Sequence, residues 1–138
     1  MIAYLDSSVL LRVVLGQPNA LPEWSAIEAG IVSALVEVEC LRTLDRLRLL
    51  QGLSDDELAM RREGIYRLLD AVEMIDPTRP VVSRAAQPLP TALGTLDAVH
   101  LATAILWREQ RHAGLVMATH DEALATAAKA SGFRVVGI

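Results

Sequence analysis

Four of the seventeen acidic residues differ from the others because each one borders an apolar segment that is predicted to be buried. Asp6 directly follows the apolar residues 2–5 in YLDSSVLL, and Asp121 follows a second apolar segment in MATHDEAL. Asp97 lies in the first turn of the helix predicted from TLDAVHLATA, and Glu39 borders the apolar stripe of a helix in VSALVEVECLR. Parallel strands collect functional groups at their carboxyl ends, so we expect these four side chains to reach one edge of a sheet.

Carboxylates that meet within a few ångströms repel one another and raise one another's pKa, so such a cluster needs a cation. Hard oxygen ligands favour Mg²⁺ or Mn²⁺, and the sequence has no cluster of Cys and His residues for zinc. A cation held by carboxylates polarises a phosphodiester and lowers the pKa of a bound water. The four acids therefore predict a Mg²⁺- or Mn²⁺-dependent hydrolase whose natural substrate is a nucleic-acid phosphodiester.

Each acid also has an ordinary structural explanation when it is taken alone. Asp6 could be a helix N-cap, and Asp97 and Asp121 would gain about 0.3–1 kcal/mol from the dipoles of the helices that they begin. Glu39 could pair with Arg42 three residues later. Only the meeting of all four at one place distinguishes a reactive site from four separate structural roles.

The composition limits the class of protein. The chain has 138 residues, 52% of them hydrophobic, which predicts one domain over residues 1–138 with a sizeable core. A net charge of −4 argues against a strong non-specific nucleic-acid binder. No apolar run is long enough for a membrane span, and the start does not resemble a signal peptide, so we expect a cytoplasmic protein without membrane contact. Cys40, the single cysteine, is expected to be buried and reduced.

Apolar segments alternate with helical patterns along the chain. We predict strands at residues 2–5, 30–34, 72–76, 114–119 and 133–138. We predict helices at 7–16, 21–30, 34–50, 54–71, 95–111 and 119–132, and a short one in the first half of 78–94. Capping boxes are expected at Ser54 with Glu57 and at Thr119 with Glu122, and Thr95 is expected to cap its helix. Helices between nearly uniformly apolar strands predict an α/β sandwich around a parallel sheet.

On the basis of these residues, the whole sequence resembles the PIN-domain ribonucleases, and closely the VapC-type toxins of bacterial toxin–antitoxin pairs. Four motifs carry the resemblance, in chain order: YLDSSVLL with Asp6 and its following hydroxyl, Ser7 or Ser8; SALVEVECLRTL with Glu39; TLDAVHLATA with Asp97; and ATHDEALATAAKASGFRVV with Thr119 and Asp121. The resemblance implies a PIN-like three-layer sandwich whose parallel sheet has the order 3-2-1-4-5. It also implies cleavage of RNA by an endonuclease that depends on Mg²⁺ or Mn²⁺.

The resemblance assigns roles and partners. Asp6 and Asp97 would be the principal metal ligands, and Glu39 and Asp121 would complete the acidic pocket and position or deprotonate the attacking water. Supporting hydrogen bonds would come from Ser7 or Thr119. The family usually forms homodimers and is inhibited by a cognate antitoxin of the VapB type, so we expect both here, with DNA bound only through the antitoxin.

Several alternatives stay open. The chain could be an RNA-processing PIN nuclease that is not a toxin, or a non-catalytic protein that uses the acidic pocket to bind a partner or a structural cation. A phosphatase of the haloacid-dehalogenase type is disfavoured because Ser8 stands where that class needs a second Asp, and a response-regulator receiver because Lys129, the only lysine, lies inside the last helix. His100, three residues after Asp97, could touch substrate or bond to a neighbour, and we assign no chemistry to His120.

Overall fold

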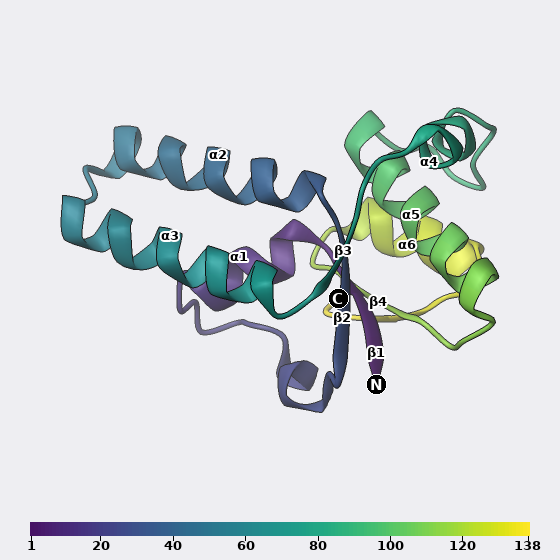
Figure 1. Cartoon of the computed structure of the whole chain (residues 1–138), viewed down its shortest axis with the longest axis horizontal. Helices are drawn as coiled ribbons and strands as arrows, with labels where there is room; N and C mark the ends of the chain where they lie inside the picture. The colour runs from purple at the N-terminus through teal and green to yellow at the C-terminus, as the bar shows by residue number, and fades with distance from the viewer.

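The computed structural model describes all 138 residues, and a five-stranded sheet forms its centre. The strands are β1 (Ile2–Leu5), β2 (Ala29–Ser33), β3 (Glu73–Ile75), β4 (Val116–Ala118) and β5 (Arg134–Val136). Their order is β3-β2-β1-β4-β5, and every neighbouring pair is parallel (Figure 1). The expected sheet and its order 3-2-1-4-5 are therefore confirmed.

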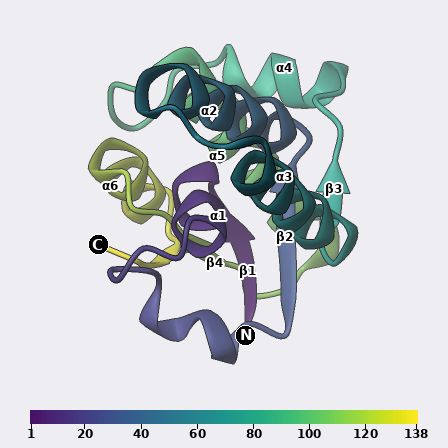
Figure 2. The ribbon, with the colours of Figure 1, turned by 90° about the vertical axis from the view of Figure 1, so that its left-hand side faces the viewer.

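Six α-helices cover the two faces of this sheet. They are α1 (Ser7–Val14), α2 (Leu35–Gln51), α3 (Asp55–Asp70), α4 (Arg79–Ala85), α5 (Thr95–Arg111) and α6 (Glu122–Ala130). Helices α1, α2 and α3 lie on one side, and α4, α5 and α6 lie on the other, which gives the three-layer sandwich that was expected (Figures 1 and 2). None of these helices combines the length and hydropathy that a bilayer crossing requires.

Strand β1 shows why both faces are filled. Its side chains alternate, so Ala3 and Leu5 join the apolar cluster under α1, α2 and α3, whereas Tyr4 joins the cluster under α5 and α6. All three residues are at most 1% exposed. Helices on both faces thus explain why the strands are almost continuously apolar in sequence.

The predicted helix over residues 21–30 is wrong. A short 3₁₀ helix, η1 (Pro22–Ala26), ends early, and strand β2 begins at Ala29. Gly30 lies inside this strand rather than after a helix. A Cβ atom there would lie 2.7 Å from Leu5 Cδ1 and 2.9 Å from Val72 Cγ1, so this glycine serves close packing.

Two of the three predicted caps also differ from the structure. The Ser54 hydroxyl accepts a hydrogen bond from the Glu57 backbone N–H at 3.2 Å, as expected. Gly94, not Thr95, is the N-cap of α5, so Thr95 is already helical. Helix α6 is capped by the Asp121 carboxylate, not by Thr119, because the Thr119 hydroxyl is engaged elsewhere.

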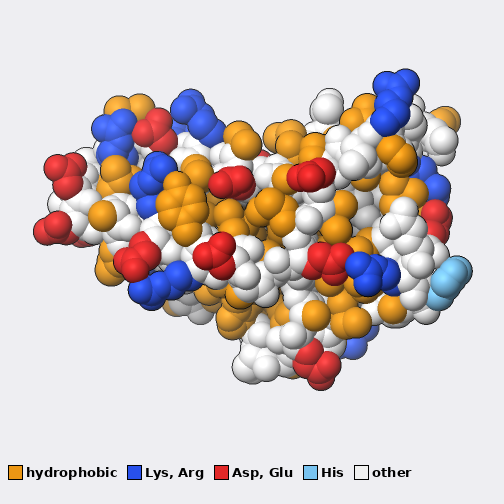
Figure 3. Space-filling view, in the orientation of Figure 1, with side chains coloured by type: hydrophobic (Ala, Val, Ile, Leu, Met, Phe, Trp, Pro, Cys, Tyr) orange, Lys and Arg blue, Asp and Glu red, His pale blue; other side chains and the backbone are white.

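The carboxyl ends of β1 and β4 lie side by side. Leu5 is paired with Ala118 in the sheet, and the Asp6 backbone N–H donates to the Ala118 carbonyl at 3.1 Å. The residues that follow these strands, Asp6 and Thr119, therefore meet at one edge. On the face of the molecule seen in Figure 3, basic, acidic and apolar side chains are interspersed, and no continuous basic surface is present.

Candidate active site

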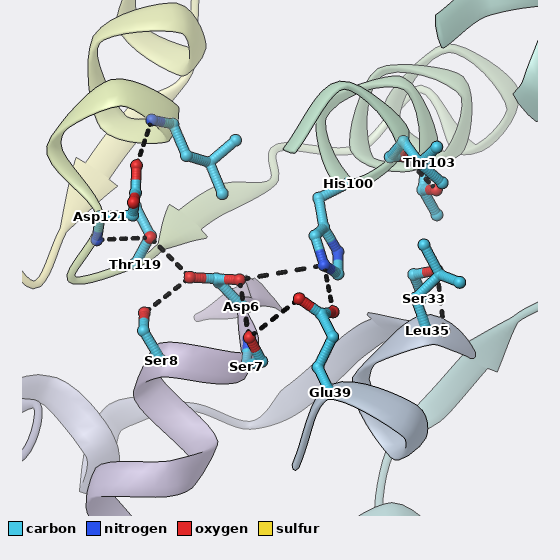
Figure 4. A network of polar contacts seen from close by, with 12 residues as sticks. Asp6, Ser7, Ser8, Ser33, Leu35, Glu39, His100, Thr103, Thr119 and Asp121 are labelled. Carbon is cyan, nitrogen blue, oxygen red and sulfur yellow. Dashed lines mark hydrogen bonds and ion pairs between the residues drawn. The ribbon is translucent and has the colours of Figure 1, made fainter. Parts of the chain in front are cut away.

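Asp6 is the most tightly held of the four predicted acids. It is the N-cap of α1, where its Oδ1 accepts a hydrogen bond from the Ser7 backbone N–H at 2.8 Å. Its Oδ2 accepts from Ser8 Oγ at 2.6 Å and from Thr119 Oγ1 at 2.9 Å (Figure 4). Only 6% of the side chain is exposed. Hydrogen bonds to a carboxylate are short and strong, so they fix the direction in which the remaining lone pairs point.

Glu39 faces Asp6 from the second turn of α2. Its Oε1 lies 2.6 Å from His100 Nε2, and its Oε2 accepts from Ser7 Oγ at 3.3 Å (Figure 4). The same Ser7 Oγ lies 3.4 Å from Asp6 Oδ1, so one hydroxyl joins the two carboxylates. The alternative pairing of Glu39 with Arg42 does not form.

His100 connects the acidic edge to the buried core. It is fully buried on α5, and its Nδ1 lies 2.7 Å from the hydroxyl of Tyr4, which is also fully buried. Burial alone would lower the pKa of His100. The hydrogen bond that His100 donates to Glu39, and the charges of Glu39, Asp6 and Asp97, raise this pKa above its usual value. The pKa of Tyr4 is raised well above 10, first by burial and then by the charge of Asp6, so the phenol keeps its proton.

Asp97 is the third residue of α5 and makes no hydrogen bond or salt bridge through its carboxylate. Its pKa is raised, first by burial and then by the negative charges of Asp121 and Asp6, while His100 opposes this effect. The charges of the other acids therefore act on this carboxylate, and no lysine or arginine forms a salt bridge with it.

Asp121 combines a structural role with its place in the cluster. Its Oδ1 accepts a hydrogen bond from the Leu124 backbone N–H at 2.8 Å, which caps α6. Its own backbone N–H donates to Thr119 Oγ1 at 3.0 Å. The Thr119 hydroxyl thus binds Asp6 on one side and the Asp121 backbone on the other (Figure 4).

The predicted residues fall into two groups by the kind of contact that joins them. Asp6, Glu39, Ser7 and Thr119 share one hydrogen-bonded network, and Asp97 and Asp121 are associated with it through charge or the backbone. Sequence reasoning gave no firm place to Ser8, whose hydroxyl also accepts from the His120 backbone N–H at 3.0 Å. It missed Tyr4, although a polar aromatic residue in an aliphatic strand is a signal that could have found it.

The donor set fits a hard divalent cation bound by few protein ligands. No lysine or arginine forms a salt bridge with any of the four acids, so their negative charge is balanced only by His100. No three His, Cys, Asp or Glu side chains are spaced to hold one ion together. Mg²⁺ is commonly bound by one or two carboxylates and keeps several waters. It therefore does not need a complete set of protein ligands around it.

Fold and site together define an α/β protein with a cluster of acids at the carboxyl edge of a parallel sheet. The family model described as "PIN domain" matches residues 3–130. The chain therefore belongs to the PIN domain family.

Two curated relatives from Mycobacterium tuberculosis match nearly the whole chain. The protein named Ribonuclease VapC47 (strain CDC 1551 / Oshkosh) is 27% identical over 132 residues, which cover 94% of this chain and 92% of that protein. The protein named Ribonuclease VapC46 (strain ATCC 25618 / H37Rv) is 29% identical over 138 residues, covering 96% and 95%.

Solved structures share the fold at lower identity. A toxin–antitoxin complex from Klebsiella pneumoniae superposes with a TM-score of 0.65 at 18% identity, covering 91% of each chain. VapBC2 from Rickettsia felis, bound to a DNA fragment from its promoter, superposes with a TM-score of 0.68 at 13% identity, covering 98% of this chain and 97% of that chain. At these identities the likeness concerns the fold alone.

Proposed function

We propose that this protein is an endoribonuclease that depends on Mg²⁺ or Mn²⁺ and acts as the toxin of a VapBC-type toxin–antitoxin pair. The observation that carries the proposal is a cluster in which Ser7 links Asp6 and Glu39, and the charges of Asp121, Asp6 and Glu39 raise the pKa of Asp97. None of these acids has a lysine or arginine counter-ion. Such an arrangement costs stability through mutual repulsion, which a bound cation would relieve. The names of the two curated relatives support ribonuclease activity.

Asp6 and Asp97 are the proposed metal ligands. Asp6 is held in a fixed direction by its hydrogen bonds, and Asp97 is free of any bond that a metal would have to break. When bound, a divalent cation supplies Lewis-acid polarisation of the phosphodiester and lowers the pKa of water.

Glu39 and Asp121 are proposed to orient the attacking water and to accept its proton. Glu39 is suited to this because its side chain is 20% exposed while its Oε1 is fixed by His100. Ser7 shares its one hydroxyl proton between Glu39 Oε2 and Asp6 Oδ1. Thr119 donates to Asp6 Oδ2 and accepts from the Asp121 backbone N–H, which holds the start of α6 beside Asp6. This pairing keeps the acid that orients water beside the acid that binds metal.

The test is cleavage of labelled RNA by the purified protein freed of antitoxin, with Mg²⁺, with Mn²⁺ and with EDTA. We expect cleavage with either metal, none with EDTA, and none by Asp97→Asn protein of unchanged circular dichroism. Cleavage in EDTA would contradict the metal assignment. A folded wild-type protein that cuts no tRNA, rRNA or mRNA would favour a non-catalytic binding protein.

The proposed toxin role is supported by the descriptions of solved structures that share this fold. The superposed structures are described as a toxin–antitoxin complex and as VapBC2 on promoter DNA. We propose that this chain likewise pairs with a VapB-type antitoxin, forms a homodimer in the cytoplasm, and reaches DNA only through the antitoxin.

Expression of the protein should arrest growth, and Asp6→Asn should relieve the arrest without unfolding the protein. A nuclease that cuts RNA without arresting growth would instead be an RNA-processing enzyme. Light scattering would give the oligomeric state.

A further inference from the structure

The buried pair Tyr4 and His100 takes no direct part in the proposed chemistry. Both side chains have 0% exposure, so neither can touch substrate. They nevertheless form a continuous line of short contacts, from the Tyr4 hydroxyl through both ring nitrogens of His100 to Glu39 Oε1, with distances of 2.7 and 2.6 Å. Figure 4 shows the His100 ring of α5 pointing across the site at Glu39 of α2.

The direction of the second contact follows from the chemistry of its partners. An ionised carboxylate only accepts hydrogen bonds, so the 2.6 Å contact requires a proton on His100 Nε2. A neutral imidazole carries one proton, and it can sit on Nε2 only if Nδ1 is an acceptor. The Tyr4 hydroxyl meets this need by donating to Nδ1.

The arrangement does not depend on the charge of the ring. If the imidazole is protonated, Nδ1–H donates to the Tyr4 oxygen and Nε2–H still donates to Glu39. The other neutral tautomer would place the Nε2 lone pair 2.6 Å from a carboxylate oxygen, which is repulsive. Tyr4 is therefore compatible with each state of His100 that directs a proton at Glu39.

We propose that Tyr4 and His100 are positioning residues that hold the Glu39 carboxylate in the orientation needed for catalysis. This inference rests on the proposed function of Glu39. His100 fixes Oε1 from the core side, and Ser7 binds Oε2 from the side of Asp6, so the carboxylate is braced at both oxygens. A glutamate side chain has several rotatable bonds, and bracing removes the alternative rotamers that would point it into solvent.

The critical variant is Tyr4→Phe, because it keeps the ring and removes only the hydroxyl. We expect kcat for RNA cleavage to fall by about 10- to 100-fold, the size typical for loss of an outer partner of a functional group, with KM unchanged. The matched control is Trp107→Phe on α5, the helix that carries His100. This change also removes one aromatic hydrogen-bond donor, the Trp107 Nε1–H that donates to Glu73 at 3.3 Å. The bond lies outside the proposed site, so kcat should stay at the wild-type value.

Variants of His100 distinguish positioning from simple packing. In His100→Gln the amide can place a donor near the former Nε2, whereas in His100→Asn the shorter amide stays near the former Nδ1. We expect the glutamine variant to keep more activity than the asparagine variant at equal thermal stability. Equal activities in the two variants would contradict a role that acts through Glu39.

A proton NMR spectrum gives a readout that does not depend on cleavage. The Nε2 proton in a 2.6 Å bond to a carboxylate should resonate far downfield in the wild type and in Trp107→Phe, and should be lost or broadened in Tyr4→Phe. An unchanged resonance and unchanged kcat in Tyr4→Phe would overturn the inference. If the wild type shows the resonance but cuts no RNA, the proposed function fails while the positioning of Glu39 stands.

Discussion

Thr119 and Asp6 are 113 residues apart in sequence, yet Thr119 Oγ1 donates a 2.9 Å hydrogen bond to Asp6 Oδ2. Both residues are buried, at 0% and 4% exposure. They come together because β1 and β4 are neighbouring parallel strands and each residue directly follows its strand. The bond therefore ties the first motif of the sequence to the last one.

Replacing Thr119 by valine should weaken both the fold and the site. The change leaves Asp6 without one donor and the Asp121 N–H without its acceptor, so we expect the free energy of unfolding to fall by about 1–3 kcal/mol. Urea unfolding at pH 7 would measure this loss. Thr119→Ser keeps the hydroxyl and should lie closer to the wild type, and similar losses in the two variants would show that the hydroxyl is not the cause.

Gly137 should not tolerate a side chain. Its φ is +101°, and a Cβ atom would lie 2.5 Å from the Thr119 carbonyl oxygen. We expect Gly137→Ala to cost at least about 1–3 kcal/mol of unfolding free energy, because backbone strain and a backbone clash add together. Gly114→Ala is the control, since nothing lies within 4 Å of a Cβ there. Equal melting temperatures of the two variants would contradict the assigned clash.

Asp97→Asn should stabilise the metal-free protein while abolishing the proposed activity. The folded pKa of Asp97 is raised above its usual value of 3.8, so the stability that it contributes is present below that pH and is lost as pH rises through the folded pKa. At pH 7 the ionised Asp97 side chain thus lowers the free energy of unfolding, and the neutral asparagine removes this loss. Thermal unfolding in EDTA should show a higher melting temperature for the variant at pH 7.

Two comparisons would distinguish a melting temperature raised by removal of the Asp97 charge from one raised for another reason. The advantage of Asp97→Asn should shrink as pH falls through the folded pKa of Asp97. It should be lost below the usual value of 3.8, where Asp97 is protonated in both the folded and the unfolded chain. Added Mn²⁺ should raise the melting temperature of the wild type more than that of the variant, because a ligand stabilises the folded state that binds it. An advantage that is independent of pH would point to packing rather than to charge.

Cys40 should be inert in the native protein. Burial, followed by the charges of Glu39 and Asp6, raises the pKa of its thiol to about 12, so almost no thiolate exists at pH 8. We expect a thiol reagent such as DTNB to label the native protein only at the rate at which it opens, and to label it at once in concentrated urea. Rapid stoichiometric labelling without urea would contradict the burial of Cys40.

Much of the architecture could be predicted because parallel α/β folds leave strong local signals. Asp6 and Asp121 each follow an apolar strand before a helix, which was enough to place them at one sheet edge. The strand order came from the resemblance to PIN domains, since local patterns do not specify which strands become neighbours. The predicted helix over 21–30 failed because Gly30 looks like a helix stop, whereas its small size serves packing against Leu5.

The details of the site depend on contacts that no short window of sequence contains. Thr119 followed by Glu122 looks like a capping box. The Thr119 hydroxyl donates to Asp6 instead, and the Asp121 carboxylate caps α6. The partners of His100 lie 96 and 61 residues away, at Tyr4 and Glu39. Such pairings follow from the packing of α5 against the sheet. Helical periodicity in the sequence does not indicate which distant residues that packing brings together.

The bond between Thr119 and Asp6 also has a consequence for how the chain is synthesised. A ribosome releases β1, α1 and α2 long before the segment around β4, so the nascent chain carries Asp6 and Glu39 while it still lacks Thr119 and Asp121. The acidic site is completed only when that late segment has emerged and β4 has paired with β1, a contact between distant residues that forms slowly. On the proposed function, ribonuclease activity that requires Asp121 and the bond between Thr119 and Asp6 would begin only after nearly the whole chain has been made and folded.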